Sequence, residues 1–150
     1  MEANKLNKEL MFGNYVYFNC FDGSKIVVKL TGVVNNIIYG DSEFGSHWCD
    51  IKNVEPIKLT TEILEKIGFE RCVSSINRTS TSAVTVCESN QFANKEFGAN
   101  TRIIDMGIHG FTLITEVFGT TEKNKINHIF YVHQLQQALK LCEIEKEIIL

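Results

Sequence analysis

Two runs of aromatic and β-branched residues decide the fold of this chain: GNYVYF at residues 13–18 and KIVVKLT at residues 25–31. Such residues are typical of a pleated, half-buried surface. Asp22-Gly23 lies between the runs and is a strong signal for a tight turn between antiparallel strands. The opening of the chain therefore predicts a β-hairpin.

The alternation of short strands and turns continues as far as the single proline, Pro56. Asn35-Asn36 indicates a turn within residues 33–39, residues 40–46 are loop-like, and residues 48–57 alternate between apolar and polar types. Four or five short strands joined by tight turns are typical of a small antiparallel barrel or a strongly curved sheet.

A short helix is predicted after this strand-rich part. Thr60 or Thr61 can cap it, Glu62 lies in its first turn, where a negative charge is favourable, and Gly68 ends it. One face of this helix is apolar, formed by Ile63, Leu64 and Ile67. We expect that face to cover a sheet.

The remainder of the chain predicts a second antiparallel sheet and a final helix. Strands are expected at residues 69–76, 83–88, 102–108, 111–118 and 126–132. Residues 133–149 predict a helix whose apolar stripe includes Leu135 and Leu139. The fold class is therefore α+β, in one domain over residues 1–150, with a sub-division near residues 57–68 left open.

Composition and charge exclude several classes of protein. The formal net charge is −3, with Lys and Arg scattered singly among acids, which disfavours binding to long nucleic acids. Apolar stretches fall far short of the roughly 20 residues that a membrane helix needs. Residues 1–10 have no apolar core, so we expect no secretory signal. The five cysteines are odd in number and widely spaced, which indicates reduced thiols in a cytoplasmic protein.

Three segments carry a resemblance to a known family: LMFGNYVY at residues 10–17, VEPIKLTTEILEKIGF at residues 54–69 and YVHQLQ at residues 131–136. In this order and spacing they resemble a family of small proteins from Bacteroidetes and their phages, whose pattern is GN-V, PI-LTEE-L-K-GF and VHQLQN. The end departs, because ALKLC at residues 138–142 stands where many relatives have an aromatic pair and a TGEEL ending. The resemblance implies a bacterial host cytosol and a phage or mobile-element context, and it transfers no activity.

Two constellations suggest chemistry only weakly. His47 and Cys49 have ligand spacing, but a zinc site needs four ligands and the other cysteines stand alone, so we expect no metal. Asp105 and His109 flank a strand end without a Gly-x-Ser-x-Gly elbow. An enzyme that acts on a nucleotide through this pair is the weaker alternative. No phosphate-binding glycine loop is present, so no cofactor is expected.

The polar start of the last helix has two interpretations. HQLQ at residues 133–136 offers amide donors for recognition of a partner. Alternatively, His133 and Gln134 satisfy backbone groups at the junction between strand and helix. The second, architectural interpretation is favoured.

The polar loop at residues 89–101 is the candidate ligand site. Its two phenylalanines, Phe92 and Phe97, look exposed among polar neighbours, and Lys95, Arg102 and, in a neighbouring turn, Arg78 add positive charge. Together they could stack on a nucleotide and neutralise it. The alternative, in which both rings pack in the core, is favoured.

For function, this site predicts a non-catalytic phage or mobile-element protein that captures a small anionic ligand, such as a nucleotide defence signal. The alternative is a protein-interaction or structural module that uses a sheet edge or the last helix. Formation of a homo-oligomer is left open.

Overall fold

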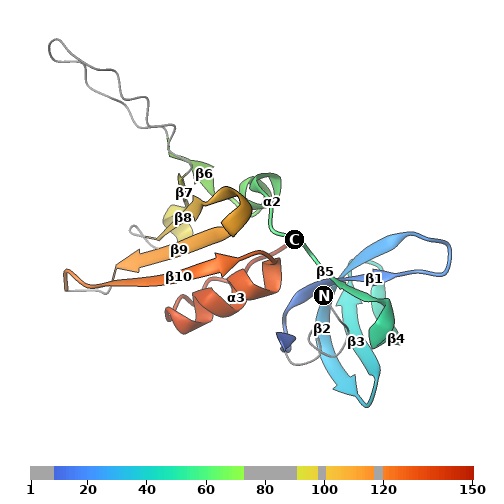
Figure 1. Cartoon of the computed structure of the whole chain (residues 1–150). Coiled ribbons are helices and arrows are strands. Elements are labelled where there is room, and N and C mark those ends of the chain that lie inside the picture. Colours follow the sequence, from blue (N-terminus) through green and yellow to red (C-terminus); the bar gives the residue numbers. More distant parts are fainter. Residues whose placement is uncertain (1–8, 73–90, 98–100, 117–119) are drawn as a thin grey trace, which may run out of the picture.

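The computed structural model describes residues 9–72, 91–97, 101–116 and 120–150, without the side chain of Lys95. These residues form two five-stranded antiparallel sheets and two helices, so the chain is α+β, as the sequence predicts (Figure 1). Neither sheet is closed into a barrel, so the barrel alternative is wrong.

The first sheet has the strand order β4-β3-β2-β1-β5. Its strands are β1 (Tyr15–Asn19), β2 (Lys25–Val34), β3 (Ile37–Ser42), β4 (Gly45–Asp50) and β5 (Val54–Pro56). The hairpin predicted at Asp22-Gly23 joins β1 to β2, and the 3-10 turn η1 (Ile51–Asn53) returns the chain so that β5 pairs with β1. Residues 40–46, expected as a loop, instead contain the end of β3 and the start of β4. β4 is therefore an edge strand, paired only with β3 in the described part of the chain.

The second sheet has the strand order β10-β9-β8-β7-β6. Its strands are β6 (Glu70–Arg71), β7 (Gln91–Ala93), β8 (Arg102–Asp105), β9 (Phe111–Glu116) and β10 (Lys123–Ile129). Two 3-10 turns, η2 (Lys95–Phe97) and η3 (Gly107–His109), lie between strands, and η3 ends β8 earlier than predicted. The strand expected at residues 83–88 lies outside the described residues, as does the end of the strand expected at residues 69–76.

The two helices begin where the sequence predicts, but the second ends early. In α2 (Thr61–Lys66), the Thr60 side chain accepts a hydrogen bond from the backbone N–H of Ile63 at 3.3 Å. α3 (Val132–Leu141) stops eight residues before the predicted end, because Glu143 takes a left-handed conformation with φ 59°. The chain then returns and Ile148 enters the core, only 2% exposed. The helix prediction beyond Leu141 is therefore wrong.

Two apolar clusters form the core, and they divide near the predicted sub-division. The smaller contains residues of the first sheet and η1: Val16, Phe18, Val28, Leu30, Ile38, Ile51 and Val54. The larger begins at Ile57 and includes residues of both helices and the second sheet. Tyr15, Tyr17 and Val27 of the first sheet also pack against the larger cluster. The first sheet therefore covers its own core and also contacts the second half.

Candidate functional site

The two phenylalanines of the predicted ligand site lie in the core. Phe92 is 1% exposed and Phe97 is 3% exposed, which confirms the interpretation that both rings pack in the core and removes the exposed rings from the ligand-site hypothesis. β7 places Phe92 opposite Ile103 on the buried face, and Phe97 stacks on Phe69 with ring centroids 4.9 Å apart. Both residues have polar neighbours in the sequence, so their burial could be seen only once the tertiary structure was known.

Of the three predicted cations, the structure places only Arg102, and it lies on the face of the sheet opposite to the Phe92 ring. Arg78 and the side chain of Lys95 lie outside the described parts. Arg102 is exposed and pairs across the sheet with Ile114, which in turn pairs with Lys125, also exposed. Since Arg102 and Ile103 are successive residues of one strand, they point to opposite faces of the sheet. The ligand site formed by the two phenylalanines and the three cations therefore stays a prediction, and exposed aromatic rings no longer argue for it.

Exposed aromatic side chains gather instead on the first half of the chain. Among the described residues, six aromatic side chains are well exposed, and five of them precede residue 50: Phe12, Phe21, Tyr39, Phe44 and Trp48. Contiguous exposed apolar surface commonly marks an interaction site. The first sheet is therefore the better place to search for function.

Two of these rings line one hollow, which we call the Trp48 groove. It has a volume of about 460 Å³ and lies between the turn that joins β1 to β2 and the edge strand β4. Buried or half-buried apolar side chains, Phe18, Ile26 and Cys49, form part of its lining. Phe21 and Trp48 also line it, and Trp48 is 70% exposed while Phe21 is fully exposed.

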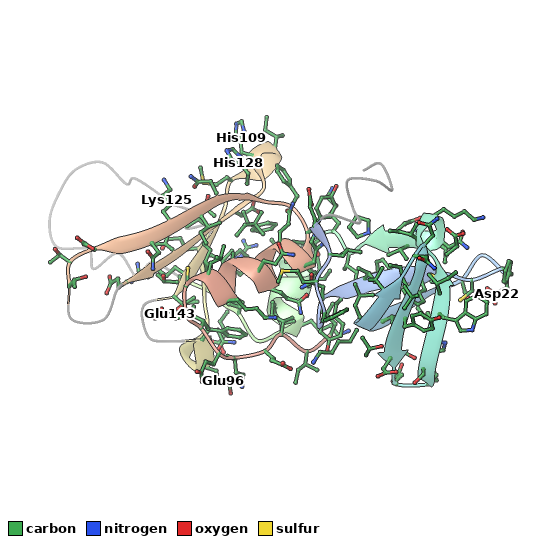
Figure 2. The ribbon with its side chains drawn as sticks, turned by 90° about the horizontal axis from the view of Figure 1, so that it is seen from below. Asp22, Glu96, His109, Lys125, His128 and Glu143 are labelled. Carbon is green, nitrogen blue, oxygen red and sulfur yellow. The ribbon has the colours of Figure 1, made fainter. Side chains whose placement is uncertain are left out.

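Local hydrogen bonds hold Phe21 at the tip of its turn. The Cys20 N–H donates to the Ser24 carbonyl at 2.8 Å, and Gly23 has a φ of 82°, which glycine adopts easily. The Asp22 carboxylate accepts hydrogen bonds from the hydroxyl and the N–H of Ser24, at 2.6 and 2.9 Å. These bonds, the hydroxyl's first, lower the pKa of Asp22. Asp22 therefore carries a negative charge at the tip of the first sheet, next to Phe21 in the sequence (Figure 2).

The β4 side of the groove combines an aromatic ring, a thiol and a carboxylate. Trp48 lies opposite Tyr39 in the register of β3 and β4. The Asp50 carboxylate caps η1 by accepting a hydrogen bond from the Lys52 N–H at 3.0 Å. Burial, followed by the neighbouring Asp50 and Cys20, raises the pKa of Cys49 to about 11. The thiol is therefore protonated at neutral pH and is a poor nucleophile.

The first sheet has no unpaired cation to offer an anion. Each lysine of residues 10–57 pairs with a carboxylate: Lys25 with Glu55 at 2.5 Å, Lys29 with Glu147 at 2.9 Å and Lys52 with Asp50 at 3.7 Å. Three acids of the same residues form no ion pair within the described structure: Asp22, Asp41 and Glu43. Asp41 and Glu43 line a different hollow, so the negative charge near the groove comes from Asp50, which lines it, and from Asp22, which is next to Phe21 in the sequence.

Neither constellation that suggested metal binding or catalysis is assembled in the described residues. His47 Nε2 lies 2.7 Å from the Ser42 hydroxyl, and no group of three potential metal ligands is found in the described part. Asp105 accepts a hydrogen bond from the Gly107 N–H at 2.8 Å and so stabilises η3, where His109 is exposed (Figure 2).

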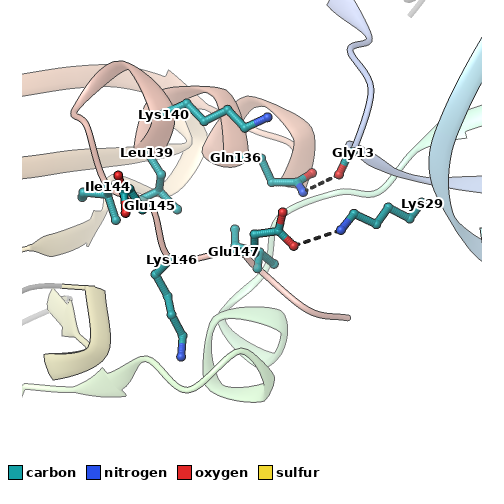
Figure 3. A pocket seen from close by; sticks show the side chains of 10 residues that line it. Gly13, Lys29, Gln136, Leu139, Lys140, Ile144, Glu145, Lys146 and Glu147 are labelled. Atoms are coloured by element: carbon teal, nitrogen blue, oxygen red, sulfur yellow. Dashed lines mark hydrogen bonds and ion pairs between the residues drawn. The ribbon is translucent and has the colours of Figure 1, made fainter.

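The polar motif at the start of α3 joins this helix to neighbouring backbone. The Gln134 side chain accepts hydrogen bonds from the N–H groups of Phe130 and Tyr131, which confirms its architectural role. Gln136 donates to the Gly13 carbonyl at 3.0 Å (Figure 3) and accepts from the Tyr15 N–H, also at 3.0 Å. These contacts join α3 to the segment that leads into β1.

Two further residues complete this junction, which we call the α3 seam. Gln137 donates to the Asn14 side chain at 3.2 Å, and His133 Nε2 lies 3.6 Å from a carboxylate oxygen of Glu9. His133 is fully buried and neither ring nitrogen has a hydrogen-bond partner in the described structure, so the prediction that His133 satisfies a backbone group is wrong. Sequence reasoning singled out Gln136 as part of the HQLQ motif but missed Gln137, although the spacing of both from His133, three and four residues, places all three on one helix face.

Comparisons with known proteins supply no relative. No protein-family model matches the chain, and neither the curated proteins nor the solved structures contain a match. The resemblance to the small phage and Bacteroidetes family stays a prediction. Of the helices in the described residues, none has the length and apolar character to cross a membrane.

Proposed function

We propose that this protein is a non-catalytic interaction module whose first sheet binds an extended segment of another protein. One observation carries the proposal: two exposed aromatic rings, Phe21 and Trp48, line a groove beside an edge strand. An extended segment can pair with such an edge through main-chain hydrogen bonds. Its alternate side chains then point to one face, where a groove can select them.

The proposed site has the character of a protein-binding surface. Aromatic side chains are enriched among the residues that dominate the energy of protein interfaces. Trp48 and Phe21 expose their rings although apolar walls lie next to them. A bound side chain would cover both rings at once and remove their apolar area from water.

A second candidate is capture of a small anion, such as a nucleotide, on the second sheet. Arg102 and Lys125 support it, because both are exposed and both pair with Ile114, one on each side. A phage or mobile-element setting, as the sequence resemblance implies, suits either candidate. The buried phenylalanines no longer favour this one, so it ranks second.

Selection from a random library of linear peptides tests the first candidate. Trp48 is the single tryptophan of the chain, so its fluorescence reports directly on the groove. Selected peptides should shift Trp48 emission, and Phe21→Ser should weaken their binding at least tenfold. The matched control is Phe44→Ser, since Phe44 is 76% exposed but lines a different hollow. A library without binders, or binders indifferent to Phe21→Ser, would overturn the proposal.

A further inference from the structure

We infer that the segment bound in the Trp48 groove carries a positively charged side chain, arginine or lysine, that lies against Phe21 and Trp48 and pairs with Asp50. This inference rests on the proposed function, since it names the chemistry of the partner at that site. Three independent observations lead to it: the free aromatic faces, the paired lysines and the carboxylates beside the rings.

The two rings of the groove are free to receive a cation. Among the described residues, neither Phe21 nor Trp48 stacks on another ring or carries a cation. The chain's own cations use other rings, with Arg71 lying 5.4 Å from the centroid of Phe92 and Lys25 lying 6.0 Å from that of Tyr17. A cation over an aromatic face is attracted by the ring quadrupole, most strongly for tryptophan.

Charge around the groove favours a basic partner over an acidic one. Asp50 lines the groove, and Asp22 is held ionised next to Phe21 by its hydrogen bonds to Ser24. An acidic segment would meet these carboxylates with no unpaired lysine of the first sheet to offset them. A like-charge approach is costly, so the groove discriminates by sign.

Lys52, His47 and Cys49 also line the groove, and they do not oppose this arrangement. Lys52 is the cation that lines it, but its side chain is 71% exposed and lies 3.7 Å from Asp50, an arrangement that contributes little to stability. An incoming guanidinium can displace Lys52 and bind Asp50 with two parallel hydrogen bonds. His47 is engaged with Ser42, and Cys49 is uncharged because its pKa is raised.

Four synthetic peptides that differ at one position test the inference. The probe is acetyl-Thr-Val-Arg-Val-Thr-amide, with lysine, glutamine and glutamate analogues at the central position. Binding is followed by Trp48 fluorescence and by the NMR signal of its indole N–H. We expect the arginine and lysine peptides to bind at least tenfold more tightly than the glutamate peptide, with the glutamine peptide between them and with a difference that shrinks at high salt.

Asp50→Asn is the decisive variant, because asparagine keeps the cap of η1 while removing the charge. It should weaken the arginine peptide several-fold and leave the glutamine peptide unchanged. Asp41→Asn, a carboxylate of the same sheet that does not line the groove, should change neither. Equal binding of all four peptides, or no response of Trp48 to any of them, would overturn the inference. The proposed function fails separately, when the peptide library yields no binder at the groove.

Discussion

Replacing Gln136 by alanine should loosen the connection between the two sheets. The substitution removes two hydrogen bonds of 3.0 Å and leaves the Gly13 carbonyl and the Tyr15 N–H without these partners. Each such bond contributes about 0.5–1.5 kcal/mol net, so the expected loss of stability is about 1–3 kcal/mol. With a urea dependence of about 2 kcal/mol per molar, the midpoint of unfolding should fall by roughly 0.5–1.5 M.

Two spectroscopic probes, one in each half of the chain, show which half is destabilised by Gln136→Ala. Trp48 fluorescence follows the first sheet, and far-ultraviolet circular dichroism follows mainly α2 and α3. In the wild type the two unfolding curves should coincide, whereas in Gln136→Ala the Trp48 curve should move to lower urea than the dichroism curve. Thr60→Ala is the control, since loss of a helix cap costs a similar ~1 kcal/mol away from the α3 seam and should shift both curves together. Coincident curves at the wild-type midpoint in Gln136→Ala would refute the reasoning.

Three further predictions concern single side chains. Leu135→Ala should cost roughly 2–5 kcal/mol in thermal or chemical unfolding, because Leu135 is fully buried, while Leu141→Ala on the exposed side of α3 should cost little. Burial, partly offset by Glu9, lowers the pKa of His133 below 6.5, so the unfolded chain binds the proton more tightly. The free energy of unfolding should therefore be constant above about pH 6.5 and fall as the pH drops further, and His133→Asn should reduce that fall. If the second sheet captures a nucleotide, calorimetry with mono-, di- and cyclic nucleotides should detect binding that Arg102→Ala weakens by about 2 kcal/mol, and no binding by wild type would exclude that candidate.

Features with a local cause could be predicted from the sequence. Asp22-Gly23 sets the first hairpin, and Thr60 caps α2 through a hydrogen bond within three residues. Features with a tertiary cause could not. Gly40 is typical of a loop, yet it lies within β3, and glycine is required there because a side chain would collide with Val28 of the neighbouring strand. No glycine or proline follows Leu141, so nothing in the sequence marks the early end of α3.

The candidate site shows the same division. Phe92 and Phe97 sit among polar residues, and only the pairing of β7 with β8 shows that they are buried. Trp48 has the alternating pattern of a core residue, yet it is exposed because β4 ends the sheet in the described part of the chain. Phe21 carried a usable signal, since an aromatic residue next to a tight turn lies at the tip of a hairpin, where neighbouring strands cannot cover it.

The α3 seam has a consequence for synthesis on the ribosome. All strand pairings of the first sheet form within residues 15–56, whereas its connection to α3 requires Gln136. Domains and local units fold as they emerge, so the first sheet can assemble while the last helix is still to be translated. During that interval, the face with Tyr15 and Tyr17 lacks the helix and the core that later pack against it. The nascent chain therefore exposes this apolar surface until α3 has been translated. We expect chaperones that recognise apolar surface to bind the chain during that interval.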